Sequence, residues 1–161
     1  MFGFFKKKKA FTVTSPTRGK LIELSKVKDP VFAQKMMGDG FAIGPDTSAG
    51  VIIVEAPVSG KIVSLPTSKH AFGIHTDNGV DVLVHIGIDS VNLKGKGFES
   101  FVQEEDKVKQ GQKIIQLDPQ ILKENKIDDT IMVIFTSGYD KAISLNEAYG
   151  TEVSSDEKLI G

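Results

Sequence analysis

The chain contains three histidines, His70, His75 and His85, and all of them lie within one short segment. Imidazole changes charge near neutral pH, and its neutral form can act as a nucleophile or as a metal ligand. The sequence contains no cysteine, which excludes disulfides, thiol catalysis and cysteine-bound metal. Any nucleophilic or metal-binding chemistry of imidazole groups is therefore confined to residues 70–85.

Residues 80–88 alternate between apolar and other side chains, which is the pattern of a strand with one buried face. The set expected to face the core comprises Val80, Val82, Val84, Ile86 and Ile88. The set expected to face outward comprises Asp81, Leu83, His85, Gly87 and Asp89. His85 is thus predicted to stand on the exposed face of a stiff sheet.

The run Asp77-Asn78-Gly79 before this strand indicates a tight hairpin turn. With a two-residue loop, either register places His70 and His85 on the same face, with Cβ atoms roughly 4.5–8 Å apart. His75 falls on the opposite face in both registers. A loop of odd length would break this prediction, because a slip of one residue exchanges the two faces.

Two imidazoles on one face could share a small ligand such as a phosphoryl group or a metal ion. Two of three histidines also meet by chance often enough that the pattern alone leaves function open. His75 is interpreted as a surface residue. Apolar residues near the pair either complete a second core or form a rim that docks a partner; they are Phe32, Met37, Leu83 and Val91.

The composition is that of one globular domain of 161 residues, with 25% charged and 40% hydrophobic residues. The net charge of −1 provides no overall attraction to nucleic acid, and no nucleic-acid partner is expected. No apolar run approaches the ~20 residues of a membrane helix. The N-terminus places apolar residues before lysines, the reverse of a secretory signal, so we expect a cytoplasmic protein.

Short stretches rich in Val, Ile, Leu, Phe and Thr, separated by 16 glycines and 6 prolines, predict an all-β sandwich or barrel-like single domain. The clearest strands are residues 51–55, 61–65, 80–88, 113–117 and 130–135. One or two short helical turns are expected at 118–125, where Asp118 can cap and Pro119 suits the first position, and at 29–36. Glycines near residues 38–40 indicate a close backbone approach that needs positive φ. The domain is expected to span 11–161, ending in a frayed tail at 154–161.

Residues 1–10 are expected to form a flexible N-terminal arm. Its apolar residues Phe2, Phe4 and Phe5 precede Lys6–Lys9. Such an arm could make a weak contact with a membrane surface, through aromatic insertion and attraction to anionic lipid. A disordered, solubilising tail is the alternative.

Residues 70–74, 77–91 and 93–98 resemble the enzyme IIA component of the glucose family (EIIA-Glc) of the bacterial phosphoenolpyruvate:sugar phosphotransferase system. Residues 38–43, 56–60 and 106–112 match the same family, and the resemblance covers residues 12–153. It implies an antiparallel β-sandwich. It also implies that His85 accepts a phosphoryl group on Nε2 from the phosphocarrier HPr and passes it to a cysteine of the sugar permease IIB domain. His70 would stabilise the phosphoryl group, and Ser68 stands where a family threonine orients this second histidine.

The resemblance also implies how partners dock. Asp29 and Asp89 match acidic positions that meet basic residues of HPr. Apolar positions of the docking rim are matched by Val31, Phe32, Met37, Leu83 and Val91. Transfer requires no cofactor, although in one family complex with a regulatory target the two histidines bind a zinc ion that the partner completes. Pro30, Pro66 and Glu105 depart from the family pattern and affect partner choice and local packing.

Three alternatives remain beside this interpretation. A zinc hydrolase related to β-sheet metallopeptidases would need a third ligand and a His-x-His element, which the sequence lacks. Residues 55–61 and 108–112 echo biotinyl and lipoyl domains, but those are shorter and carry a modifiable lysine in a context absent here. A regulatory binding protein of the same fold, without transfer, is the third.

Overall fold

The computed structural model describes residues 10–161. The arm predicted for residues 1–10 and its membrane contact therefore fall almost entirely outside the described residues. Within residues 10–161, no helix is long and apolar enough to cross a membrane.

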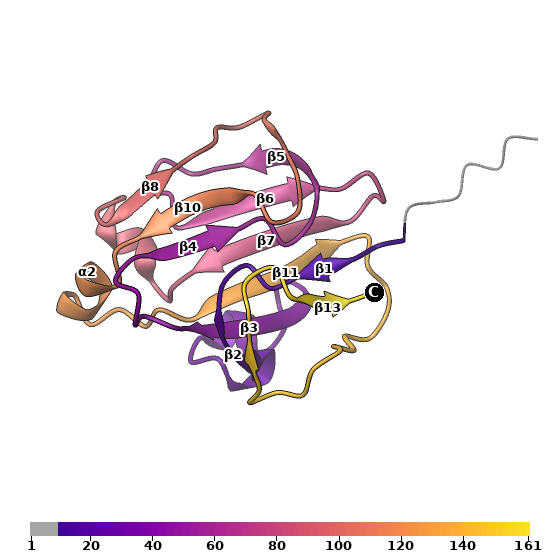
Figure 1. Cartoon of the computed structure of the whole chain (residues 1–161), viewed down its shortest axis with the longest axis horizontal. Helices are drawn as coiled ribbons and strands as arrows, with labels where there is room; N and C mark the ends of the chain where they lie inside the picture. Colours follow the sequence, from indigo (N-terminus) through magenta and orange to yellow (C-terminus); the bar gives the residue numbers. More distant parts are fainter. Residues whose placement is uncertain (1–9) are drawn as a thin grey trace, which may run out of the picture.

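The described chain is an antiparallel β-sandwich, as predicted (Figure 1). The larger sheet has eight strands, in spatial order β12 (Glu152–Val153), β2 (Gly19–Glu23), β3 (Asp39–Pro45), β11 (Ile131–Ser137), β7 (Asp81–Ile86), β6 (Ala71–His75), β5 (Gly60–Ser64) and β9 (Lys107–Val108). The smaller sheet contains β4 (Ile52–Glu55), β10 (Lys113–Leu117) and β8 (Phe98–Ser100). A third pair joins β1 (Val13–Thr14) to β13 (Lys158–Ile160). The five predicted strands are confirmed, with small shifts at their ends.

Two short α-helices and two 3₁₀ turns complete the described elements. They are α1 (Pro30–Ala33), α2 (Pro119–Glu124), η1 (Leu24–Lys26) and η2 (Ser90–Leu93). Asp118 caps α2 by accepting a hydrogen bond from the Gln120 backbone N–H, and Asp29 caps α1 in the same way through Val31. Both predicted helical turns are therefore confirmed.

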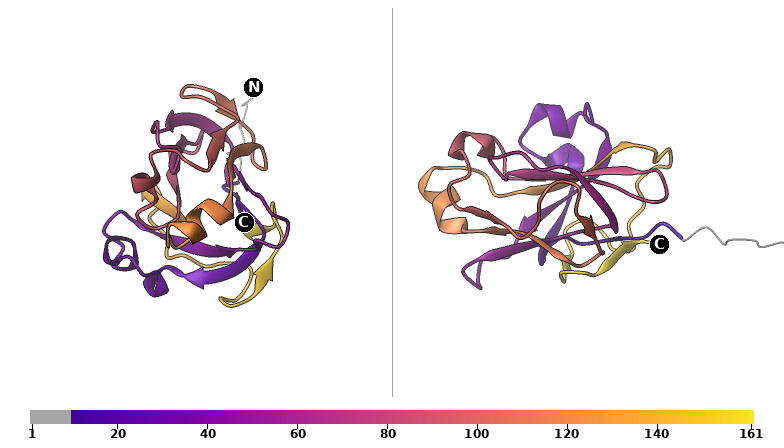
Figure 2. Two further views of the ribbon diagram at one scale, coloured as in Figure 1. Left: turned by 90° about the vertical axis from the view of Figure 1, so that its left-hand side faces the viewer. Right: turned by 90° about the horizontal axis from the view of Figure 1, so that it is seen from above.

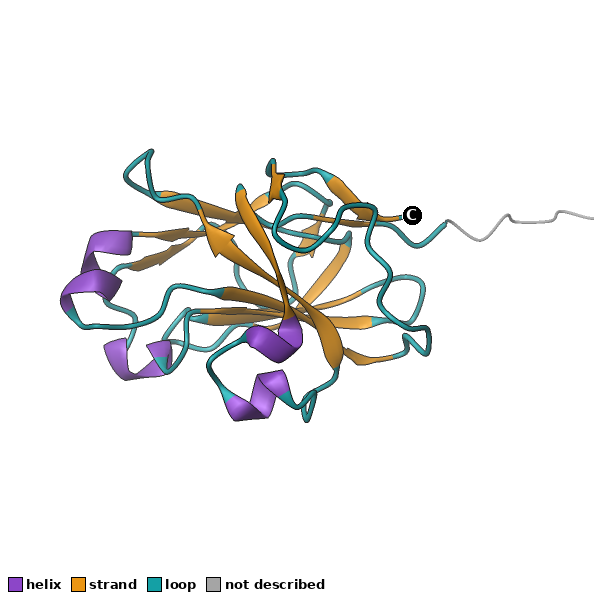
Figure 3. Ribbon diagram, turned by 90° about the horizontal axis from the view of Figure 1, so that it is seen from below, coloured by secondary structure: helices purple, strands orange, loops and turns teal. Residues whose placement is uncertain are grey.

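The main core fills the space between the eight-stranded and the three-stranded sheet, with Phe41, Phe72 and Ile115 fully buried. A smaller cluster covers the outer face of the eight-stranded sheet, where η1 and α1 pack (Figures 2 and 3). Its buried members are Leu24, Val27, Phe32, Ala42, Met132 and Ile134. The middle strands β3, β11 and β7 are thus covered on both faces, which gives any residue on them a rigid base.

The chain end was predicted as a frayed tail, and this prediction is wrong. Residues 158–160 form β13 against β1, and Leu159 is fully buried. Leu159 and Ile160 belong to the main core. The free energy gained by burying these two apolar side chains outweighs the tendency of a polar chain end to fray.

The strand after the hairpin ends earlier than predicted. Gly87 has φ of 80°, so β7 ends at Ile86 and the alternation is broken. Ile88 consequently packs on the smaller outer cluster and not in the main core. The other four core positions, Val80, Val82, Val84 and Ile86, face the main core as expected.

Gly40 shows why glycine is needed near the start of β3. Gly38 has the expected positive φ of 133°, but at Gly40 the constraint is space, because a Cβ atom would lie 1.9 Å from the Val133 carbonyl oxygen. We predict that Gly40→Ala lowers the free energy of unfolding by at least about 2 kcal/mol, since β3 and β11 must separate. Urea denaturation measures this loss.

Gly44→Ala, on the same strand, is the matched control. Its Cβ atom would meet the end of the Ile22 side chain at 3.3 Å and the Lys20 carbonyl oxygen at an ordinary contact distance of 3.9 Å. This variant should remain within about 1 kcal/mol of the wild type. Equal losses in the two variants would contradict the argument from backbone contact.

Candidate functional site

The hairpin that carries the histidines has an odd loop. β6 and β7 pair with His75 opposite Asp81 and Ala71 opposite His85, and Thr76 bonds to Val80, which leaves residues 77–79 as the loop. Both two-residue registers predicted from the sequence are therefore wrong. The loop takes a third residue because Gly79, with φ of 81°, closes the turn onto Thr76.

His75 lies on the same face as His85, contrary to the prediction, because the odd loop exchanges the two faces. Its Nδ1 atom is 2.6 Å from Asp81 Oδ1, beside the turn of the hairpin. The side chain is exposed, and it pairs with Asp81. His75 is a surface residue, as interpreted from the sequence, but on the other side of the sheet.

His70 reaches His85 by a different route from the predicted one. It lies just before β6, after Lys69 turns the chain through a left-handed backbone conformation with φ of 55°. The rings of His70 and His85 meet edge to face, with centroids 5.0 Å apart and an interplanar angle of 79°. The two imidazoles are neighbours because of this bend, whereas strict strand alternation would have separated them.

Each ring is held through its Nδ1 atom. Nδ1 of His85 is 2.9 Å from the Gly87 carbonyl oxygen. A carbonyl can only accept, so this nitrogen carries the hydrogen, and in the neutral ring Nε2 holds a free lone pair. Nδ1 of His70 is 2.6 Å from Ser68 Oγ. Both Nε2 atoms therefore remain for a shared ligand.

Burial, and to a smaller extent the neighbouring His70, lower the pKa of His85 to about 4. The Gly87 carbonyl and the carboxylates of Asp29 and Asp89 act in the opposite direction. Burial also lowers the pKa of His70. Both imidazoles are therefore neutral at pH 7, the form in which imidazole acts as a nucleophile.

We predict that His85 stays uncharged when the pH falls from 8 to 5.5, as measured by ¹⁵N NMR of the ring. The unfolded chain binds this proton near pH 6.5, whereas the folded protein binds it only near pH 4. The free energy of unfolding should therefore decrease by about 2–3 kcal/mol as the pH falls from 6.5 to 4.5. A His85→Gln variant should lose that part of the pH dependence in urea titrations. A ring titration midpoint near 6.5 in the wild type would contradict the prediction.

The predicted acidic residues flank the pair. Asp29 precedes α1, and its Oδ1 accepts a hydrogen bond of 2.9 Å from the Val31 backbone N–H. Asp89 precedes η2 with φ of 59° and is exposed. Both carboxylates are close enough to His85 to act on its pKa. The site therefore combines two neutral imidazoles with an acidic margin.

The predicted rim divides into an exposed part and a floor. Val31, Met37 and Val91 are exposed by 42%, 43% and 50%. Phe32 is buried, with its ring centroid 4.9 Å from that of His85, and Leu83 is half-buried on the smaller cluster. Met36, beside Met37, is exposed by 70% and was not among the predicted rim residues.

Three departures from the family pattern, Pro30, Pro66 and Glu105, fit local structure. Pro30 occupies the first position of α1, where proline is favoured. The Pro66 carbonyl accepts a hydrogen bond from the Lys69 N–H, which forms the turn that presents Ser68 and His70. Glu105 adopts φ of 79°, a conformation usual for glycine, and pairs with Lys61 at 2.6 Å.

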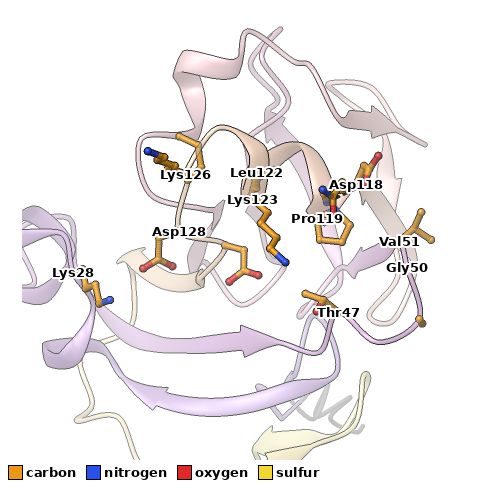
Figure 4. Close-up of a pocket in the computed structure, with 14 residues that line it drawn as sticks. Lys28, Thr47, Gly50, Val51, Asp118, Pro119, Leu122, Lys123, Lys126 and Asp128 are labelled. Carbon is orange, nitrogen blue, oxygen red and sulfur yellow. Dashed lines mark hydrogen bonds between the residues drawn. The ribbon is translucent and has the colours of Figure 1, made fainter.

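A cavity of about 1100 Å³ lies between α2 and the loop after β3, apart from the histidines. Lys28 and Asp128 line one side, Thr47 and Val51 the other, and Lys123 belongs to α2 (Figure 4). Lysines and aspartates are balanced in its lining, so its charge selects no ligand class. The imidazole pair, with its defined hydrogen bonds, is the site with defined chemistry.

Among residues 10–161, no group of three or more His, Asp or Glu side chains is arranged to hold a metal ion. The two imidazoles supply two ligands, whereas a catalytic zinc site uses three from the protein. The described residues therefore lack the third ligand that the alternative zinc hydrolase requires.

The model of one protein family, the phosphoenolpyruvate-dependent sugar phosphotransferase system EIIA 1, matches residues 11–140. The chain belongs to this EIIA family. The resemblance inferred from the sequence is thereby confirmed. The EIIA family acts in phosphoryl transfer during sugar uptake, so the chain is a component of a phosphotransferase system.

Individual EIIA relatives agree. The PTS system glucose-specific EIIA component of Halalkalibacterium halodurans is 40% identical over 145 residues, covering 90% of this chain and 81% of that protein. The solved structure of glucose permease IIA from Mycoplasma capricolum is 38% identical, with a TM-score of 0.83 over 99% of this chain and 98% of that one. The PTS system glucose-specific EIICBA component of Streptococcus pneumoniae is 46% identical over 126 residues, which are 17% of its length. The EIIA fold thus occurs both alone and within much longer chains.

Proposed function

We propose that this EIIA protein accepts a phosphoryl group from phospho-HPr on Nε2 of His85 and passes it to a cysteine of a sugar permease IIB domain in the cytoplasm. The observation that carries the proposal is the hydrogen bond between His85 Nδ1 and the Gly87 carbonyl. It places the proton on Nδ1 and the lone pair on Nε2, the nitrogen that would attack phosphorus. The low pKa of His85 keeps that lone pair available.

In the first step the Nε2 lone pair forms a bond to phosphorus while the bond between phosphorus and the HPr imidazole breaks. The electron pair of the broken bond returns to the HPr ring. Positive charge develops on the His85 ring, and the Gly87 carbonyl stabilises it through Nδ1–H. In the second step a thiolate of IIB attacks the same phosphorus, and the electron pair returns to His85 Nε2. Catalysis then depends on positioning and on neutralising the phosphoryl oxygens.

His70 would supply a hydrogen-bond donor for those oxygens. If the Ser68 hydroxyl donates to His70 Nδ1, across the observed 2.6 Å, the ring proton resides on Nε2. That Nε2–H would point into the space shared with His85, since the rings are 5.0 Å apart. Ser68 thus acts as a positioning residue for His70.

The surface around the pair fits a partner that is apolar at its centre and basic at its margin. Val31, Met37 and Val91 offer the exposed apolar contacts, and the carboxylates of Asp29 and Asp89 would attract the basic groups and speed encounter. Phe32 and Leu83 support this surface from below.

No cofactor is needed for the transfer. Two neutral imidazoles could also provide half of a tetrahedral zinc site, and a regulatory partner would have to supply the other ligands.

The experiment is a reconstituted phosphorelay. The protein is incubated with labelled phosphoenolpyruvate, enzyme I and HPr, and the bound label is tested for lability in acid, as expected for phosphohistidine. Purified IIB domain of a glucose permease is then added, because the relatives are named glucose-specific. Acid-labile label that moves to IIB is the expected result. Absence of label with intact binding of HPr would favour the regulatory alternative.

A further inference from the structure

The turn that follows β7 is held in an unusual backbone conformation. Gly87 has φ of 80°, and Asp89, which has a side chain, has φ of 59°. Left-handed conformations are uncommon for residues other than glycine and persist only where the surroundings hold them. This turn carries both the Gly87 carbonyl that bonds His85 and the Asp89 carboxylate that acts on it. The contacts that hold this turn in place therefore also hold Gly87 and Asp89 beside His85.

Ser90 closes the turn from inside the protein. The residue is fully buried, and its Oγ donates a hydrogen bond to the carbonyl oxygen of Ile86, four residues back. The hydroxyl also packs on Gly87, since a Cβ atom at Gly87 would lie 3.2 Å from Ser90 Oγ. A side chain without a hydroxyl could fill the space but could not make this bond.

The start of β11 holds the same turn from the other side. The Gly87 N–H donates to the Thr130 carbonyl over 2.8 Å, and the Ile88 N–H donates to the Asp128 carbonyl over 2.9 Å. Asp128 in turn is fixed by hydrogen bonds from Thr130 to its carboxylate. These two backbone bonds hold the N–H groups of residues 87 and 88. The carbonyl of Ile86 is held separately, by the hydroxyl of Ser90.

We propose that Ser90 is a positioning residue for phosphoryl transfer: its buried hydroxyl fixes the turn so that the Gly87 carbonyl holds the Nδ1–H of His85. The chain of contacts runs from Ser90 Oγ to the Ile86 carbonyl, through the Gly87 peptide, to His85 Nδ1. Without the Ser90 hydrogen bond, the Gly87 carbonyl no longer favours the tautomer of His85 with hydrogen on Nδ1. The ring then populates both neutral tautomers, and Nε2 carries a free lone pair in only one of them. The inference rests on the proposed function, because it concerns the nitrogen that would accept the phosphoryl group.

The test measures the tautomer of His85 directly by ¹⁵N NMR of the full chain near pH 7.5, without any partner. The wild type should show His85 with hydrogen on Nδ1 and a bare Nε2. In Ser90→Ala a substantial fraction of the hydrogen should move to Nε2, and phosphoryl acceptance should slow by about tenfold or more, by analogy with the loss of partners that orient metal-binding imidazoles. Ser90→Cys, with a similar shape but a weak donor, should change both quantities in the same direction and less.

Ser15→Ala is the matched control. Ser15 is also fully buried, and its Oγ donates to the Thr17 carbonyl over 2.6 Å, but neither residue lies at the histidines. This variant should lose stability without changing the His85 tautomer or the rate of transfer. If Ser90→Ala folds and His85 keeps its wild-type tautomer, the proposal is overturned. If Ser90→Ala does not fold, a wild-type tautomer in Ser90→Cys overturns it. Failure of the phosphorelay with the predicted tautomer shift present would count against the proposed function alone.

Discussion

Replacement of His85 by alanine should abolish acid-labile labelling from phosphoenolpyruvate, because the variant lacks the only proposed acceptor. The Nε2 atom of His85 is the one whose lone pair is defined by the bond to Gly87. The ring of His70 cannot substitute, because its Nε2 would donate and not attack if Ser68 donates to Nδ1. The measurement is the amount of label retained on the protein at equilibrium, with a circular dichroism spectrum to verify the fold.

His75→Ala is the control for this experiment. His75 stands on the same face of the sheet and also has a hydrogen-bonded Nδ1, but its partner is Asp81, away from the pair. Labelling of His75→Ala should equal that of the wild type. Label that persists in His85→Ala and disappears in His75→Ala would contradict the assignment of the acceptor.

Replacement of His70 by alanine should slow phosphoryl transfer in both directions without removing the acceptor. Loss of one preorganised donor to a developing negative charge costs on the order of 10²-fold in rate. The label should therefore approach the wild-type amount, but with a rate constant about 100-fold lower. Rapid-quench measurement with phospho-HPr, followed by addition of IIB, separates the rate from the final amount.

His70→Gln tests the reason for this loss. An amide N–H can still donate to a phosphoryl oxygen, so part of the rate should return and labelling should be retained. Ser68→Ala should behave as a milder form of His70→Ala, because the ring remains but loses its 2.6 Å contact. A wild-type rate in His70→Ala would remove the stabilising role from this residue.

The all-β architecture and most strands could be predicted from the sequence because their signals are local. The alternation of Val80, Val82 and Val84 with polar residues identifies β7, and Asp118 followed by Pro119 identifies the start of α2. The family resemblance singled out His70 and His85 as candidates, and the structure brings their rings to 5.0 Å from each other. Each of these signals depends on residue type and short spacing, which the sequence states directly.

The hairpin register could not be predicted, because Asp77-Asn78-Gly79 is compatible with loops of two or three residues. The position of His70 depends on the left-handed backbone at Lys69. Lysine is not a residue type from which this conformation would be predicted. The role proposed for Ser90 could not be predicted either, since it rests on the complete burial of this residue. Leu159 and Ile160 were assigned to a tail because their partner strand lies at the other end of the chain.

The bend that carries His70 ties the two histidines together through the backbone as well as through their rings. The His70 carbonyl accepts a hydrogen bond of 2.7 Å from the N–H of Ile86, the neighbour of His85 in β7, and the turn before His70 is closed by the Lys69 N–H and the Pro66 carbonyl. The separation of the two imidazoles is therefore set by one backbone hydrogen bond and one tight turn. A change in that turn would alter the space available to any group held between the two rings.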